Sequence, residues 1–343
     1  MAPLPRDPRR SEPVRRARSL LEHSASPARR LVAALHPSRA GRLVRHPCRA
    51  GRREALVIIT RLQGGLGNQM FQYAAGVRLA AARQTRLKLD VSLLGARDVA
   101  TPRRYELGCF RISAERATPE ELEALLAKRS LAARISPRLD RRAAARERHF
   151  HYDPAVARLP DDTCLQGYWQ SARYFEDSAE RVRQEFRFRS EPSGRNVELA
   201  EEIGARAAVS LHVRRGDYAA HAATRAYHGL CPVDYYHRAA SYVAERVRDP
   251  IFVLFSDDPE WTRTHLDLRA RTIAIEHNGP DDGAEDLRLM SLCRHHVIAN
   301  STFSWWGAWL CTKPEKIVTA PERWFSDGAR DTSDLIPDRW VRL

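Results

Sequence analysis

The stretch Val209-Ser-Leu-His-Val-Arg-Arg-Gly-Asp-Tyr218 joins an apolar run directly to two arginines, a glycine and an aspartate. The alternating apolar residues predict a buried strand that ends at the first arginine. In open α/β sheets, ligands bind at the carboxyl ends of the strands, which is where Arg214 and Arg215 would lie. A guanidinium stays charged, and its planar set of donors matches phosphate oxygens. The stretch therefore favours a phosphate site, but it fits equally well a surface loop held by an arginine–aspartate pair.

Beyond this stretch, short apolar runs alternate with amphipathic segments of about ten residues, the mark of a parallel sheet covered by helices on both faces. Right-handed crossovers then place all the strand carboxyl ends at one edge. The expected strands are 208–213, 251–256, 272–276, 296–299 and 316–319, and the expected helices are 234–247, 259–266, 285–294 and 302–311.

The first half begins with a strand at 56–60, a glycine turn at Gly64-Gly-Leu-Gly67, a helix over 68–82 and a strand at 87–91. This order predicts a Rossmann-like unit, although Met70 breaks the dinucleotide-binding fingerprint. Further on we expect helices over 119–126 and 174–186, a strand over 163–169, and a solvated helix face in the basic stretch 138–148. The fold class is therefore α/β, with domains at 55–205 and 206–343.

The net charge of +14 belongs mostly to the first 54 residues, which contain 14 arginines and 4 acidic residues and carry +10. The rest of the chain carries only +4, which disfavours nucleic-acid binding by a basic domain face. The proline, serine and alanine content of residues 1–54 predicts that this tail is disordered. Three interpretations stay open: an inert extension, a transit-like segment, or an arm that contacts anionic lipid at about 1 kcal/mol per basic residue.

No apolar run approaches the ~20 residues of a membrane-spanning helix, and no signal peptide with an apolar centre is visible. The 6 cysteines are scattered, without Cys-x-x-Cys pairs or zinc-like spacing. Reduced thiols in a cytoplasmic protein are the simplest account. We therefore expect a cytoplasmic protein, either free or peripheral on the inner face of the membrane, with no metal site.

Four polar loops follow strands of the second half and should converge at one edge: 214–218, 256–259, 278–282 and 300–304. The last precedes a helix whose free N–H groups and dipole suit a phosphate, with an ordinary Ser/Thr cap as the alternative. Asp286 follows the third loop, either to accept hydrogen bonds from a nucleobase or to complement its helix dipole. Together the loops predict a nucleotide site.

Read together, segments spread over roughly residues 55–325 resemble the α1,2-fucosyltransferase family, especially its bacterial branch. In chain order, the matching segments are Gly64-Gly-Leu-Gly-Asn-Gln-Met-Phe-Gln-Tyr-Ala74, His212-Val-Arg-Arg-Gly-Asp-Tyr218, Phe255-Ser-Asp-Asp-Pro-Glu-Trp261, Asp286-Leu-Arg-Leu-Met-Ser-Leu-Cys-Arg-His295, Asn300-Ser-Thr-Phe-Ser-Trp-Trp-Gly-Ala-Trp-Leu310 and Val318-Thr-Ala-Pro321.

The resemblance implies a GT-B architecture, in which two Rossmann-like domains face a cleft. The C-terminal domain would bind GDP-fucose and the N-terminal domain would help to bind the acceptor. Members transfer L-fucose from GDP-β-L-fucose to a sugar hydroxyl, typically the 2-hydroxyl of a galactoside, with inversion and without a metal or other cofactor. A surface polysaccharide or lipid-linked glycan is the expected acceptor.

Carried over by position, Arg214 would contact the β-phosphate and stabilise the departing GDP. His212 and Arg215 would support it, with Asp217 orienting one of them, while Asp257 and Asp258 are interpreted as structural. The other expected donor contacts are Asn68 from the first domain, Asp286 at the guanine, and Ser301, Thr302 and Phe303 at the diphosphate. No catalytic base is assigned, although His212 and Asp217 are the nearby options.

Two other functions stay open. One is a fucosyltransferase of different linkage or acceptor. The other is a non-catalytic protein that binds nucleotides or nucleic acid, with the basic tail gripping phosphates.

Overall fold

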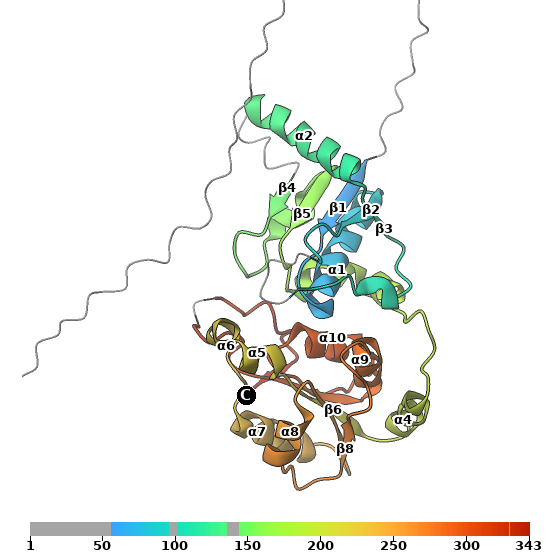
Figure 1. Ribbon diagram of the computed structural model, residues 1–343, viewed down its shortest axis with the longest axis vertical. Helices are drawn as coiled ribbons and strands as arrows, with labels where there is room; N and C mark the ends of the chain where they lie inside the picture. Colours follow the sequence, from blue (N-terminus) through green and yellow to red (C-terminus); the bar gives the residue numbers. More distant parts are fainter. Residues whose placement is uncertain (1–55, 96–101, 136–143, 329) are drawn as a thin grey trace, which may run out of the picture. The chain divides into compact units, whose positions relative to one another are not determined.

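The structure is a computed structural model that describes residues 56–95, 102–135, 144–328 and 330–343. The basic tail 1–54 and residues 138–143 of the basic stretch lie outside the described residues. The regular structure consists of two separate parallel sheets and their helices (Figure 1). The first sheet has the strand order β3-β2-β1-β5-β4. Its strands are β1 (Val57–Arg61), β2 (Arg86–Asp90), β3 (Glu115–Arg116), β4 (Ala144–Arg146) and β5 (Thr163–Gln166).

The first half contains helices α1 (Leu66–Ala82), α2 (Pro119–Ile135) and α3 (Ala179–Glu185). Helix α1 begins two residues before the predicted start, because Gly65 takes the extended conformation of an N-cap. The interpretation of 138–148 as a helix face is wrong over 144–146, which pair with β5 as β4. The predicted helix over 174–186 is also shorter, since short 3-10 turns precede α3.

The second sheet has the order β11-β10-β9-β6-β7-β8, and all of its paired strands are parallel. Its strands are β6 (Ala208–Val213), β7 (Ile251–Ser256), β8 (Thr272–Ile275), β9 (His295–Val297), β10 (Val318–Ala320) and β11 (Val341–Arg342). Strands β6 and β7 have the predicted bounds. Their register pairs Val213 with Ser256, so both strands end side by side.

Helices cover both faces of this sheet, as the alternation predicted (Figure 1). They are α4 (Arg195–Gly204), α5 (Gly216–Ala220), α6 (Ala222–His228), α7 (Val233–Ala244), α8 (Pro259–His265), α9 (Gly283–Leu292) and α10 (Thr302–Leu310). Val209 and Leu211 of β6 pack with α7, whereas Ala208 packs with α4 and α9 on the other face. Helix α4, which the sequence pattern missed, thus belongs to the packing of the second sheet.

Helix α10 joins the two halves through its tryptophans, which lie in one core with residues of α1. The ring of Phe71 on α1 lies 4.5 Å from that of Trp305 and 5.0 Å from that of Trp306. Trp305 and Trp306 are fully buried in this core. Two Rossmann-like sheets that share a cleft confirm the expected GT-B architecture.

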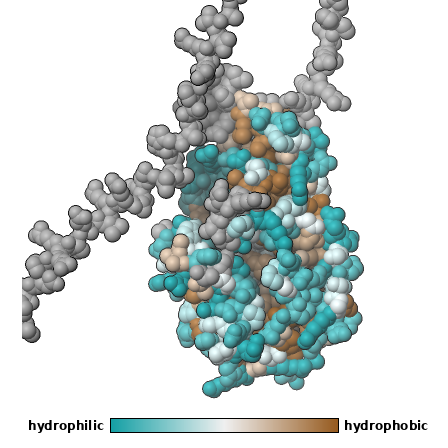
Figure 2. Space-filling view, in the orientation of Figure 1, coloured by the Kyte–Doolittle hydropathy of each residue, from teal (hydrophilic) through white to brown (hydrophobic). Residues whose placement is uncertain are grey.

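Hydrophilic residues cover most of the face drawn in Figure 2, with apolar residues interspersed among them. Within the described ranges, none of the helices combines the length and apolar character needed to cross a bilayer.

Candidate active site

Residues from both halves of the chain line a cleft of about 1290 Å³. The carboxyl ends of β6 and β7 and the N-terminal turns of α1 and α10 open into it. The structure brings most of the predicted site residues together along this cleft: Asn68, His212, Arg214, Asp286, Ser301, Thr302 and Phe303.

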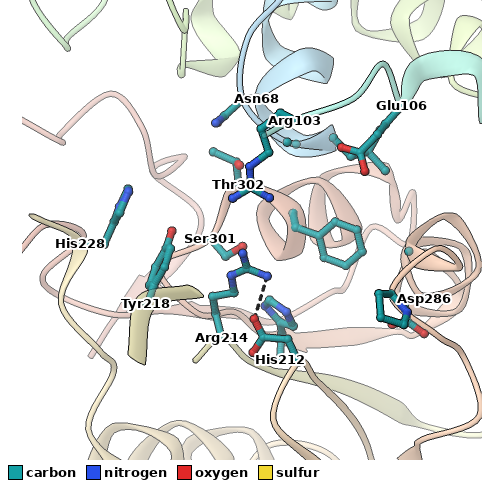
Figure 3. Close-up of a pocket in the computed structure, with 18 of the residues that line it drawn as sticks. Asn68, Arg103, Glu106, His212, Arg214, Tyr218, His228, Asp286, Ser301 and Thr302 are labelled. Carbon is teal, nitrogen blue, oxygen red and sulfur yellow. Dashed lines mark ion pairs between the residues drawn. The ribbon is translucent and has the colours of Figure 1, made fainter. Parts of the chain in front are cut away.

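Arg214 is the fixed cation at the end of β6. Its guanidinium forms an ion pair of 2.8 Å with Asp257, which follows the neighbouring strand β7 (Figure 3). The other oxygen of Asp257 accepts the backbone N–H of Arg215 at 2.7 Å. Gly216 allows this close approach, because a Cβ there would lie 2.6 Å from the Asp257 carboxylate. The predicted structural role of Asp257 is therefore to orient the arginine that faces the cleft.

Ser301 is the N-cap of α10, and its side chain makes no capping hydrogen bond within the described part of the chain. The ordinary Ser/Thr cap considered above is thus not formed. The first N–H groups of a helix lack intrahelical partners, and the helix dipole adds partial positive charge there. These N–H groups lie beside Arg214, together with the hydroxyls of Ser301 and Thr302, in an arrangement that suits an anion.

The N-terminus of α1 abuts the N-terminus of α10. A Cβ on Gly67 would lie 2.5 Å from the Thr302 carbonyl carbon and 2.7 Å from the Phe303 nitrogen, so only glycine permits this contact. Trp306 donates from Nε1 to the Gly67 carbonyl oxygen at 2.9 Å and fixes the approach. At the N-terminus of α1, Gly65 has no side chain to act as a cap, and the Glu106 carboxylate accepts a hydrogen bond from the Leu66 backbone N–H. Two helix N-termini therefore add their positive ends to one region of the cleft.

Asn68 projects from this turn into the cleft, as predicted. Its Oδ1 accepts a hydrogen bond of 2.8 Å from Gln170 Nε2, which follows β5. This contact fixes the amide so that its nitrogen is oriented as a donor.

Sequence analysis missed a second cleft arginine, Arg103. Figure 3 shows its side chain extending from the α1 side of the cleft toward Ser301, Thr302 and Arg214. Two guanidinium groups from different halves of the chain thus flank the N-terminus of α10. The pair Arg103-Arg104 carries no strand or helix pattern around it, so no sequence signal pointed to the cleft.

A buried glutamine holds the segment that carries Arg103. Gln69 donates from Nε2 to the carbonyl oxygens of Gly64 at 2.9 Å and Arg104 at 2.7 Å. Its Oε1 accepts the backbone N–H of Glu106 at 3.0 Å. The segment also carries Glu106, which lines the cleft and which the sequence pattern did not indicate. Burial raises the pKa of its carboxylate. The glutamine therefore couples the glycine turn to the arginine segment.

Asp286 lies at the far end of the cleft from the helix junction, on α9. Burial raises its pKa to about 6, while a hydrogen bond of 2.8 Å from Asn278 Nδ2 opposes the shift. Asn278 is itself held by Asn196 of α4, whose Nδ2 donates to its Oδ1 at 3.0 Å. The carboxylate is thus oriented by amides and can accept further donors from a ligand.

His212 is buried on β6 below Phe303, with its ring 5.7 Å from that of Phe303. Burial lowers its pKa to about 4; the nearby Asp257 opposes that shift and Arg214 adds to it. The imidazole is therefore neutral at pH 7. Its Nδ1 finds no hydrogen-bond partner among the described residues.

The structure does not place Arg215 in the cleft. Its guanidinium pairs with Asp258 at 3.2 Å and stacks over Trp261 at 3.9 Å, and Arg215 does not line the cleft. Arg215 therefore contributes to the Arg214 site through its backbone N–H, which binds the Asp257 carboxylate. The side chain of Asp217 lies outside the described part of the structure.

No group of three or more histidine, cysteine, aspartate or glutamate side chains in the described ranges is placed to hold a metal ion.

Comparison with known proteins confirms the family resemblance. Residues 155–342 match the model of Glycosyl transferase family 11. The chain is 32% identical over 293 residues to an alpha-1,2-colitosyltransferase of Escherichia coli, which covers 84% of this chain and 99% of that protein. It is 30% identical over 300 residues to the O-antigen biosynthesis glycosyltransferase WbnK of Escherichia coli, and the match covers 82% of this chain and 99% of that protein. A rat galactoside alpha-(1,2)-fucosyltransferase 1 is 27% identical over 191 residues, or 52% of this chain and 50% of that protein. The protein is therefore a glycosyltransferase that belongs to glycosyl transferase family 11.

Proposed function

We propose that this glycosyltransferase moves L-fucose from GDP-β-L-fucose to the 2-hydroxyl of a galactoside, with inversion and without a metal. The observation that carries the proposal is the meeting of Arg214 with the N-terminus of α10, where Ser301 makes no side-chain capping hydrogen bond in the described structure. A diphosphate is the ligand that such a site favours, because fixed N–H donors and a full cation complement its charge.

Cleavage of the glycosidic bond leaves additional negative charge on the β-phosphate of GDP. Arg214, held by Asp257, is positioned to stabilise that charge together with the helix N-termini. We propose that Arg103 completes the grip from the opposite wall. Asn68 donates from its amide toward the phosphate or the fucose ring.

Asp286 would read the guanine. Its two carboxylate oxygens can accept the N1–H and the exocyclic amine, which are present together in guanine but not in adenine. The hydrogen bond from Asn278 keeps the carboxylate in place when the site is empty. A guanine nucleotide is thus favoured over an adenine nucleotide.

Leaving-group stabilisation, rather than a strong base, is the main catalytic device in this proposal. A pKa of about 4 makes His212 a weak base, although its neutral ring can still accept a proton. We therefore place the principal effect on Arg214, whose removal should cost roughly 10²–10³ in turnover.

The direct test is incubation of the purified protein with GDP-fucose and lactose in the presence of EDTA, followed by linkage analysis of the product. We expect an α1,2-linked fucoside and stoichiometric release of GDP. The absence of both fucose transfer and GDP release would reject the proposal. A strict requirement for Mn²⁺ would reject its metal-free part, and another linkage would identify a related fucosyltransferase.

A second donor follows from the E. coli relative named as an alpha-1,2-colitosyltransferase. The diphosphate and guanine contacts proposed here would serve GDP-colitose as well as GDP-fucose. Comparison of kcat/KM for the two donors decides between them. We expect the larger value for GDP-fucose, and a larger value for GDP-colitose would reassign the donor sugar without changing the site.

A further inference from the structure

One end of the cleft is lined by aromatic side chains, which we call the aromatic arm. Its members come from both halves of the chain and from segments far apart in the sequence: Phe150, Tyr168, Tyr218, Tyr227, His228 and Phe325. The proposed function uses none of these residues.

Several rings of the aromatic arm contact one another in a series that begins at Arg214. The Arg214 guanidinium lies 5.3 Å from the ring centre of Tyr218, which stacks on His228 at 4.5 Å. The ring of Tyr227 contacts both His228, at 4.7 Å, and Phe325, at 5.3 Å. The arm is thus adjacent to the proposed diphosphate site.

The arm leads away from the proposed guanine site. In Figure 3, Tyr218 and His228 lie on one side of Arg214 and Asp286 lies on the other. A nucleotide with guanine at Asp286 and its β-phosphate at Arg214 therefore directs the transferred sugar toward the arm. In that orientation, the aromatic arm is the part of the cleft next to the transferred sugar.

The arm has a buried floor and exposed edges. Phe325 is 6% exposed, whereas Tyr227 is 42% and Tyr168 is 39% exposed. Tyr168 belongs to the first half and Tyr227 to the second, and both line the cleft. Burial raises the pKa of Tyr168, and Tyr227 adds to that shift. The two tyrosines therefore present rings and hydroxyls to the same space.

A pyranose matches this surface better than a wholly apolar ligand does. One face of a galactose ring carries C–H groups that pack on an aromatic face, and its rim carries hydroxyls. Tyrosine supplies an apolar ring with a polar tip, and ligand pockets typically combine aromatic walls with a few polar groups. The rings are placed to contact a sugar before any chemistry occurs.

We propose that the aromatic arm is the acceptor subsite and that the galactoside ring packs against the exposed faces of Tyr168 and Tyr227. The inference rests on the proposed function and extends it to the acceptor. It also shifts much of the acceptor site to the second half of the chain, since Tyr218, Tyr227 and His228 belong to α5 and α6. The remaining acceptor contacts come from the first half through Phe150 and Tyr168.

The test compares full-length Tyr227→Ala, Tyr168→Ala and Tyr227→Phe with the wild type. Tyr242→Ala is the matched control. Arg330 lies over the ring of Tyr227 at 4.4 Å and Arg246 lies over the ring of Tyr242 at 3.7 Å, but Tyr242 does not line the cleft. Two quantities are measured, the Kd of GDP by calorimetry and the Kd of lactose in the presence of GDP by saturation-transfer NMR. Transfer from GDP-fucose is recorded in parallel.

We expect each alanine variant of the arm to raise the Kd of lactose by about 10-fold or more, which corresponds to about 1.4 kcal/mol. Tyr227→Phe keeps the ring and should stay close to the wild type. The Kd of GDP should be unchanged in all variants, and Tyr242→Ala should match the wild type in both measurements.

Unchanged lactose binding in both alanine variants would overturn the inference, as would an absence of lactose binding to the wild type. An equal loss in Tyr242→Ala would also overturn it, since the effect would not be specific to the arm. Lactose binding that depends on the tyrosines, without turnover of GDP-fucose, would support the sugar subsite while rejecting the proposed donor. The two failures are therefore distinguishable.

Discussion

Helices α1 and α10 both begin at the cleft, but their N-termini are built differently. Helix α10 follows strand β9, and Arg214, which directly follows the nearby β6, is fixed by an ion pair to Asp257. Helix α1 follows a glycine turn, and its neighbouring cation, Arg103, lies on an irregular segment tied down through the Gln69 amide. The side of the cleft formed by the second half of the chain, the second-sheet wall, thus fixes the charge of Arg214 by strand geometry. The side formed by the first half, the first-sheet wall, fixes the charge of Arg103 by backbone contacts. The predictions below separate the contributions of the two walls.

The largest loss of turnover should follow a substitution in the second-sheet wall. Arg214→Ala should lower kcat by roughly 10²–10³, because it removes the full charge next to the departing phosphate. Steady-state kinetics with GDP-fucose and lactose measure the loss, and far-ultraviolet circular dichroism checks the fold. Arg246→Ala is the control, because this arginine also belongs to the second half of the chain but does not line the cleft. A rate close to that of wild type would remove Arg214 from the mechanism.

Separating the two helix N-termini should have the next largest effect. Gly67→Ala places a methyl group against the backbone of Thr302 and Phe303 and should lower the free energy of unfolding by about 1–3 kcal/mol. Misplacement of the reacting groups by about 1 Å can lower turnover by about 10²-fold. Gly204→Ala is the control, since its Cβ would meet nothing within 4 Å. Equal activity of the two variants would show that the helix junction does not position the donor.

The cation of the first-sheet wall should matter less than Arg214. Arg103→Ala should lower kcat/KM by about 10-fold, since a hydrogen bond to a charged group contributes about 1.5 kcal/mol or more. Donor and acceptor KM values are measured separately, and the donor should be the one affected. An effect confined to the acceptor KM would move Arg103 out of the diphosphate site.

A smaller effect should appear as a pH dependence of donor binding. Burial raises the pKa of Asp286 to about 6, so the ionised form that accepts guanine is lost as the pH falls through that value. The donor KM should rise about 4-fold between about pH 7.5 and about pH 5.5, as the ionised fraction falls. Asp286→Asn should weaken donor binding and remove the dependence of the donor KM on pH. The same dependence in the variant would assign the titration to another group.

The smallest effect should come from Arg215, in spite of its position next to Arg214. Arg215→Ala removes contacts with Asp258 and Trp261 outside the cleft and should reduce stability by about 1 kcal/mol. Thermal unfolding measures this loss, and kcat/KM should remain close to wild type. A loss of turnover comparable to that of Arg214→Ala would return Arg215 to the donor site.

The difference between the walls also explains which features could be predicted from sequence. Strands β6 and β7 have the expected bounds because their continuous buried runs end directly before charged residues, Arg214 and Asp257. The parallel crossovers then bring Arg214, Asp286 and Ser301 to one edge, as topology requires.

The first-sheet wall was less predictable, because its chemistry lies on irregular segments. Arg103 reaches the cleft only through the Gln69 contacts, and neither residue has a local pattern that reveals the pairing. Strand β4 has a short Ala-Ala-Arg sequence with weak strand preference, and pairing with β5 overrides the local signal. The aromatic arm likewise gathers residues from distant segments, so only the folded chain shows it.

A crystal structure of the complex with GDP tests the central claim most directly. The account predicts that the β-phosphate lies about 2.7–3.2 Å from the Arg214 guanidinium and from N–H groups at the start of α10. It also predicts guanine at Asp286 and an empty aromatic arm. A diphosphate bound elsewhere, or a guanine in the aromatic arm, would contradict the account.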